Sequence, residues 1–283
     1  MTAYASDVLV SADWVRSRLS AFRDDDPSYR LVEVDVDPRV YEDGHVPGAV
    51  TFDWKRELQD SLRFDVASRG AFERMVGDAG IATDSTVVLY GDVMNWFAAY
   101  AYWLFSYYGH TELYLLDGGR DYWVEQEGPL TDETPSFTRR EYETDPPDAS
   151  IRIDRPELEG ALDTGTRIVD VRSPQEFRGE ILAPPGWNEG VQRGGHVPGA
   201  VNVPWSRTVR PDGRFRPAEE LEALFEDEGV RDEETVVYCR IGERSALVWV
   251  ALHELLGYDD VRHYYGSWVE WGNTVGAPIE RGG

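Results

Sequence analysis

A seven-residue sequence occurs twice in this chain, and this repetition constrains the fold more than any other feature. Residues 44–50 and residues 195–201 both read Gly-His-Val-Pro-Gly-Ala-Val. Each copy is preceded by an apolar run that ends in an acidic residue and is followed by Thr-Val-Val, at Thr86 and at Thr235. Seven consecutive identities, with the same landmarks in the same order, indicate an internal duplication. We therefore predict two homologous domains, which the length of 283 residues accommodates.

Short apolar runs alternate with helical patterns in both halves of the chain. In the second half, β-branched content and shortness favour buried strands at 167–171, 200–203, 235–239 and 261–265. Helical patterns lie at 217–228 and 245–256, and Asp154 with Glu157 has the spacing of a capping box. Strands that alternate with helices imply a parallel sheet covered on both faces. The predicted fold class is α/β, with two tandem domains, each a parallel sheet flanked by helices.

The composition of the middle of the chain suggests where the two domains separate. Residues 131–150 are rich in Thr, Glu, Asp and Pro and show little apolar periodicity, which is typical of an extended linker. We therefore predict a first domain over 1–130, a linker over 131–150 and a second domain over 151–283.

The charge balance is strongly acidic. Asp and Glu number 53 against 28 Lys and Arg, the formal net charge is −25, and Lys55 is the only lysine. Because salt screens the repulsion within such a surface, this composition is typical of a halophilic organism, although an ordinary acidic cytosolic protein is the alternative. The absence of a basic patch argues against nucleic-acid binding.

Neither a leader nor a membrane span is visible in the sequence. Residues 1–10 lack a basic region followed by an apolar core. The most apolar stretch, 96–108, is shorter than the roughly 20 residues that cross a bilayer, so we expect a buried helix there. One cysteine cannot form an internal disulfide. We expect a cytoplasmic protein that does not associate with membranes.

The chain's only cysteine, Cys239, lies between a predicted strand and a predicted helix. The carboxyl end of a parallel strand is where open α/β sheets bind ligands. A helix N-terminus and the nearby Arg240 and Arg244 would each lower the pKa of the thiol, and Gly242 would let the backbone curl around the sulfur. A free cysteine is more often a small buried apolar residue. The two arginines in a short turn with the sole cysteine favour a nucleophile instead.

Several motifs together resemble the rhodanese family of sulfurtransferases over nearly the whole chain. The repeated Gly-His-Val-Pro-Gly-Ala is similar to one family signature. The other matching segments are the active-site loop Cys-Arg-Ile-Gly-Glu-Arg-Ser at 239–245, the C-terminal signature at 264–271, its first-half counterpart at 117–123, and the strand and loop at 170–179.

The resemblance implies a double-displacement reaction at Cys239. The thiolate would attack the outer sulfur of thiosulfate and expel sulfite, and an acceptor such as cyanide or a thiol would then remove the sulfur from the cysteine persulfide. Because thiosulfate is a dianion, Arg240 and Arg244 can hold its sulfonate. Arg172 is a third candidate for substrate binding, with an ion pair to Glu176 or Glu243 as the alternative. The remaining residues of the loop would cradle the persulfide: Ile241, Gly242, Glu243 and Ser245.

Two positions depart from the family pattern. Animal members with two domains often carry arginine four residues after the position matched by Arg172, whereas this chain has Glu176. The first half has no cysteine, and either Tyr90 or Gly91 stands where the nucleophile would be. The first domain is therefore expected to be non-catalytic and structural.

Three other functions remain open at this stage. Related phosphatases use a cysteine loop one residue longer, with arginine six places after cysteine, where this chain has Ser245. Sulfurtransferases that use 3-mercaptopyruvate usually carry small uncharged residues after the cysteine, so Arg240 favours thiosulfate. A persulfide carrier that hands sulfur to a partner protein would share the same loop chemistry.

We expect no metal and no organic cofactor. The histidines show no convincing ligand spacing with one another or with Cys239, and two of them belong to the repeated turn, where a structural hydrogen bond is expected. They are His45, His110, His196, His253 and His263. The expected partners are small molecules, namely thiosulfate with cyanide or a thiol, and a sulfur-acceptor protein is a further candidate.

Overall fold

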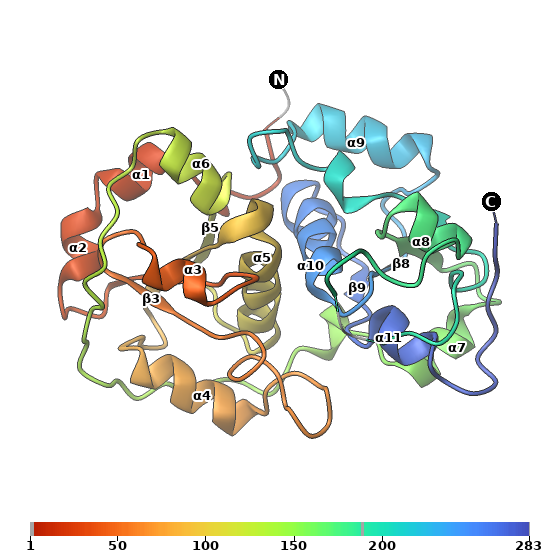
Figure 1. Cartoon of the computed structure of the whole chain (residues 1–283), viewed down its shortest axis with the longest axis horizontal. Helices are drawn as coiled ribbons and strands as arrows, with labels where there is room; N and C mark the ends of the chain where they lie inside the picture. Colours follow the sequence, from red (N-terminus) through yellow and green to blue (C-terminus); the bar gives the residue numbers. More distant parts are fainter. Residues whose placement is uncertain (1–2, 188–189, 283) are drawn as a thin grey trace. The chain divides into compact units, whose positions relative to one another are not determined.

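The protein is described from a computed structural model, which covers residues 3–187 and 190–282. The chain forms two compact units. One consists of residues 7–148 with the short segment 211–215, and the other consists mainly of residues 149–210 and those from 216 onward. Helices surround the sheet of each unit (Figure 1). This arrangement confirms the predicted α/β class with two tandem domains; the predicted boundaries stay a prediction.

The first unit is built on a five-stranded parallel sheet with the strand order β1-β5-β4-β2-β3. Its strands are β1 (Leu9–Val10), β2 (Tyr29–Glu33), β3 (Ala49–Thr51), β4 (Thr86–Tyr90) and β5 (Leu113–Leu116). Its helices are α1 (Ala12–Arg16), α2 (Leu19–Arg23), α3 (Arg39–Glu42), α4 (Arg69–Asp78), α5 (Asp92–Tyr107) and α6 (Gly119–Glu125). The apolar stretch at 96–108 lies in α5 up to residue 107, and residues 97–105 are all buried, as the sequence predicted.

The second unit is built on a four-stranded parallel sheet with the strand order β7-β6-β8-β9. Its strands are β6 (Arg167–Asp170), β7 (Val201–Asn202), β8 (Thr235–Tyr238) and β9 (Val261–His263). Its helices are α7 (Arg155–Ala161), α8 (Pro174–Arg178), α9 (Ala218–Asp227), α10 (Glu243–Trp249) and α11 (Ser267–Trp271), with 3-10 turns η1 (Ala149–Ile151) and η2 (Trp205–Arg207). A π-helical stretch, η3 (Val250–Leu255), continues α10.

The strand and helix predictions for the second half agree with this structure to within a few residues. The capping box of α7 is present, because the Asp154 side chain accepts from the backbone N–H of Glu157 and the Glu157 side chain accepts in return. The helix expected at 245–256 begins earlier, at Glu243, and becomes π-helical in its second half. Its start at Glu243 brings Glu243 and Arg244 into the first helical turn, which matters for the site.

The predicted linker is extended and packs on the first unit. Residues 132–148 contain no helix or strand. The Arg140 N–H donates to the Gly77 carbonyl at 2.9 Å, and the Tyr142 hydroxyl lies 2.9 Å from Nδ1 of His110. These contacts hold the segment by main-chain and side-chain hydrogen bonds, although it has little apolar periodicity.

The part of the chain that the structure covers contains no helix both long enough and apolar enough to cross a membrane.

Candidate functional site

Cys239 directly follows the central strand β8, two groups contact its sulfur, and a third binds its backbone. The Gly242 N–H donates to Sγ at 3.2 Å, the Glu243 carboxylate lies 3.4 Å from Sγ, and the Cys239 N–H donates to Oγ of Ser267 at 3.1 Å. Cys239 itself is fully buried. The loop therefore curls around the sulfur as the sequence predicted, and it brings in Ser267, which sequence reasoning missed.

Gly242 is required where the loop turns into α10. Its φ of 100° lies in the left-handed region that glycine tolerates best. A Cβ atom at this position would lie 2.9 Å from the Tyr265 ring. Both the backbone angle and the close approach explain why the residue that donates to the sulfur has no side chain.

The sequence argument predicted a lowered pKa for the Cys239 thiol, and the structure contradicts it. Burial, and next the charge of Glu243, raise the pKa of Cys239 above its ordinary value. The charge of Arg244 and hydrogen bonds from Ser245 act in the opposite direction but do not outweigh burial. The prediction failed because it counted the arginines of the loop but neither the burial of the thiol nor the carboxylate beside the sulfur.

Arg244 is held by two carboxylates. Its Nη1 and Nη2 atoms lie 3.0 and 3.3 Å from the two oxygens of Glu176, and its Nε lies 3.3 Å from Oε1 of Glu243. All three side chains are buried. The acidic residue at position 176, which departs from the family pattern, therefore serves as the partner of Arg244, which reduces the positive charge available to an anionic substrate.

Arg240 and Ser245 extend the site on either side of the sulfur. Arg240 is buried, and its guanidinium carbon lies 4.9 Å from the centre of the Trp187 ring. The Ser245 hydroxyl donates to the Gly242 carbonyl at 3.1 Å and lies 2.8 Å from Nε2 of His263. Ile241, the remaining residue of the loop, is half-buried. The seven predicted loop residues thus lie on one turn around the sulfur.

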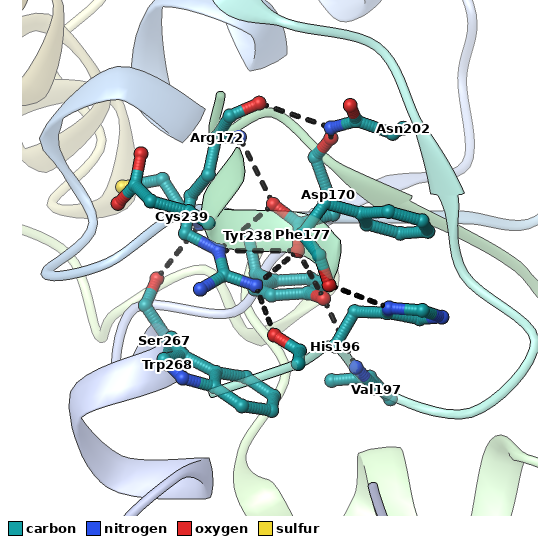
Figure 2. A network of polar contacts seen from close by, with 12 residues as sticks. Asp170, Arg172, Phe177, His196, Val197, Asn202, Tyr238, Cys239, Ser267 and Trp268 are labelled. Atoms are coloured by element: carbon teal, nitrogen blue, oxygen red, sulfur yellow. Dashed lines mark hydrogen bonds and ion pairs between the residues drawn. The ribbon is translucent and has the colours of Figure 1, made fainter. Parts of the chain in front are cut away.

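Arg172 forms an ion pair with neither of the acids that the sequence suggested. Its Nε and Nη2 bind both oxygens of Asp170, with the shortest distance 2.5 Å, and Nη2 also donates to the Gly195 carbonyl at 2.7 Å. Figure 2 shows its guanidinium beside the Trp268 ring, 4.6 Å from the ring centre. A substrate-binding role for Arg172 stays a prediction, and these contacts favour a structural role.

Asp170 is the centre of a buried network that joins β6, β8 and the repeated turn (Figure 2). Besides Arg172, it accepts a hydrogen bond from the Tyr238 hydroxyl at 2.6 Å, and the Val197 N–H donates to that same hydroxyl at 3.1 Å. His196 of the turn stacks on Phe177 with ring centres 3.6 Å apart. The network fixes Tyr238, and hence the point at which the chain enters the cysteine loop.

The first unit repeats this network around a loop that contains no cysteine. Tyr90 pairs with Glu33 across β2 and β4, as Tyr238 pairs with Asp170 across β6 and β8, and its hydroxyl bonds to Glu33. This register places Gly91 where the second unit has Cys239. A Cβ atom at Gly91 would lie 2.0 Å from the Val34 carbonyl oxygen, so the position admits no side chain.

A buried carboxyl beside this loop, Asp35 after β2, predicts a pH effect on stability. Burial and the charges of Glu33 and Asp92 raise the pKa of Asp35 to about 9. The folded state therefore holds a proton that the unfolded state releases near pH ~4, so this group costs stability as pH rises from about 4 to about 9. We expect Asp35→Asn to raise the melting temperature at pH ~8 and to flatten its fall between pH ~5 and ~8.

Asp37→Asn is the matched control for Asp35→Asn. Hydrogen bonds from Arg39 lower the pKa of Asp37 to about 2, so its carboxylate stays charged over the whole window. Its substitution should leave the slope of melting temperature against pH unchanged. Equal slopes for the wild type and Asp35→Asn would show that Asp35 is not the group responsible.

Among the residues that the structure describes, no three or more His, Cys, Asp or Glu side chains form a group that could hold a metal ion.

The chain has two α/β units, each built on a parallel sheet. Only the second carries a cysteine loop after its central strand. These features define a class of tandem-domain proteins with one thiol site. The Rhodanese-like domain model matches residues 11–126 and 154–274, one match in each half. This chain belongs to the rhodanese family.

Full-length relatives share both halves. A protein of Haloferax volcanii named "Putative thiosulfate sulfurtransferase" is 58% identical over 280 residues, covering 99% of this chain and 98% of the relative. The sulfur carrier protein TtuD of Thermus thermophilus is 49% identical over 282 residues, covering 98% of this chain and 97% of the relative.

Solved structures share the fold. The anaerobic ergothioneine biosynthesis enzyme of Chlorobium limicola, determined with trimethyl histidine, superposes with a TM-score of 0.86 at 24% identity. The superposition covers 98% of this chain and 70% of that one.

Proposed function

We propose that this protein is a thiosulfate sulfurtransferase that moves sulfane sulfur to cyanide or a thiol acceptor through a persulfide on Cys239. The observation that carries the proposal is the position of the sulfur, which lies at the carboxyl end of β8 and accepts the Gly242 N–H. The Haloferax volcanii relative, 58% identical over nearly the whole chain, supports the same reaction.

Each half of the reaction balances at the sulfur of Cys239. In the first half, the thiolate attacks the outer sulfur of thiosulfate, a new S–S bond forms, and the original S–S electron pair leaves with sulfite. In the second half, cyanide or a thiolate attacks the outer sulfur of the persulfide, and the Cys239 thiolate is the leaving group. Loop N–H groups, that of Gly242 first, would hold the persulfide charge.

The two arginines of the loop take different parts in this proposal. Arg240, buried on the same loop as Cys239, supplies charge for the sulfonate. Arg244 is bound by Glu176 and Glu243. Arg244 instead offsets the negative charge that develops beside the sulfur. Residues 151–283 form the catalytic domain, and residues 1–130, which lack a cysteine, form the non-catalytic one.

A role as a persulfide carrier is the second candidate. The 49% identity to a protein named as a sulfur carrier favours it, and the Cys239 persulfide would be the same species. A carrier would hand its sulfur to a protein thiol in place of a small acceptor. Either role fits the cytoplasm, where a free thiol persists in the reduced state.

Intact-mass measurement tests the donor directly. The purified protein is treated with thiosulfate or with 3-mercaptopyruvate in high salt, and the mass gain is followed before and after cyanide is added. We expect thiosulfate to add one sulfur atom, which cyanide removes as thiocyanate over many turnovers. If only 3-mercaptopyruvate adds a sulfur atom, then 3-mercaptopyruvate and not thiosulfate is the donor. If a sulfur atom is added but cyanide gives no turnover, the result favours the carrier role.

A further inference from the structure

The sequence predicted Glu243 as part of the persulfide cradle or as an ion-pair partner of Arg172, yet its side chain contacts the sulfur of Cys239. Oε2 accepts a hydrogen bond from the Cys239 thiol over 3.4 Å, and Oε1 lies 3.3 Å from Nε of Arg244. Glu243 is 2% exposed and Cys239 is not exposed at all. No other carboxylate contacts the sulfur among the hydrogen bonds of the described residues.

The charges around the sulfur favour a proton transfer over a proton release. Cys239, Glu243, Arg244 and Glu176 form one buried cluster whose formal charge is −1 while the thiol is neutral. Loss of the thiol proton to water would raise the buried charge to −2, which is costly in a site removed from solvent. Transfer of the same proton to Glu243 leaves the charge at −1.

The other titratable groups around the loop do not offer an alternative acceptor. Burial lowers the pKa of His263 to about 3, and its Nε2 faces Ser245 in place of the sulfur. Arg172 and Asp170 are paired with each other, and the Tyr238 hydroxyl donates to Asp170. Arg240, on the same loop, is positively charged and so cannot take a proton.

We propose that Glu243 is a catalytic base that takes the thiol proton of Cys239 and later returns it. In the first step the S–H bond breaks and an O–H bond forms on Glu243, which frees the thiolate to attack the donor sulfur. After the acceptor has taken the outer sulfur, the Cys239 thiolate recovers the proton from the Glu243 carboxyl. The inference rests on the proposed persulfide chemistry at Cys239.

Glu243 could act as a base, or its charge could only repel the Cys239 thiolate. These two roles predict opposite results for the same substitution. The Glu243 carboxylate raises the pKa of the Cys239 thiol, so if repulsion were its only effect, Glu243→Gln would speed every reaction of the thiolate. If Glu243 accepts the proton, the same substitution removes the acceptor and slows these reactions at low pH. The sign of the change therefore decides between the two roles.

Alkylation of Cys239 by iodoacetamide, followed by intact mass from pH ~6 to ~9, measures this sign without any sulfur donor. In the wild type we expect a nearly flat rate between pH ~6 and ~8, because the proton stays within the Cys239–Glu243 pair. In Glu243→Gln we expect a rate about 10²-fold lower at pH ~6 that rises about tenfold per pH unit. Glu222→Gln, an exposed change on α9, is the matched control.

Three results would overturn the inference: an equal or faster rate in Glu243→Gln, a wild-type rate that already rises tenfold per pH unit, or a wild-type thiol that iodoacetamide never modifies. Glu243→Asp keeps the carboxylate and should restore part of the alkylation rate at low pH. This rescue would show that the slow rate of Glu243→Gln comes from the missing carboxylate and not from misfolding. Failure of thiosulfate to form a persulfide in the wild type would refute the proposed function alone, since alkylation needs no donor.

Discussion

Replacing Cys239 with serine is expected to reduce thiocyanate formation from thiosulfate and cyanide by at least about 10³-fold, to the uncatalysed background. Serine nearly keeps the size of the side chain, keeps the backbone N–H that donates to Ser267, and offers a hydroxyl oxygen that can accept from the Gly242 N–H. Its hydroxyl, however, ionises at far higher pH than a thiol and cannot hold a transferable sulfur under these conditions. The measurement is steady-state turnover in high salt, with intact mass after thiosulfate treatment.

The fold of Cys239→Ser should be intact. The conformation of the loop depends on Gly242 and on the hydrogen bond from the backbone of residue 239 to Ser267, and the substitution changes neither. An unchanged melting temperature would show this directly. Turnover that survives in Cys239→Ser, with the protein still gaining a sulfur atom, would place the chemistry elsewhere. No other cysteine exists in the sequence to carry it.

Arg172→Ala is expected to destabilise the second unit by about 3–5 kcal/mol. The substitution leaves the Asp170 carboxylate buried without the guanidinium that binds both of its oxygens. The melting temperature of that unit should fall on the order of 10 °C. Tyr238→Phe removes only one hydroxyl from the same carboxylate and should cost less, about 1–3 kcal/mol.

A double variant checks the cause of this loss. Asp170→Asn combined with Arg172→Ala removes the uncompensated charge, so it should be more stable than Arg172→Ala alone. A wild-type melting temperature for Arg172→Ala would contradict the structural role. Arg172→Lys keeps the positive charge but not the two-pronged contact, and it tests substrate binding. If Arg172 contacts thiosulfate, loss of that contact should raise KM for thiosulfate in a variant whose melting temperature is unchanged.

The sequence was most informative where local pattern and structure coincide. The repeated turn and the alternation of strands and helices predicted both α/β domains, because buried parallel strands and amphipathic helices each impose their own period on the chain. The position of Cys239 between β8 and α10 followed from the same pattern. The choice between Tyr90 and Gly91 did not, because it depends on the register of β2 against β4.

The charges of the site show what pattern alone leaves open. The residue types Arg240, Glu243 and Arg244 are visible in the sequence, but their partners are not. Glu176 lies 68 positions before Arg244, and Asp170 lies 68 positions before Tyr238, so their pairing exists only after β6 and β8 are side by side. The raised pKa of the thiol follows from burial, and next from the charge of Glu243, and local pattern shows neither effect.

The sequence by itself determined the duplication, the fold class, the family resemblance and the one cysteine, which is the candidate sulfur nucleophile. The tertiary structure decided which charges face that nucleophile, because burial and neighbouring groups set the ionisation of a side chain. It paired Arg172 with Asp170 and Arg244 with Glu176, and it placed Glu243 against the sulfur. The pairing of Arg244 with Glu176 joins residues 68 positions apart and depends on strand order. The other two contacts join near neighbours, but they depend on the direction that each side chain takes where its loop leaves the sheet.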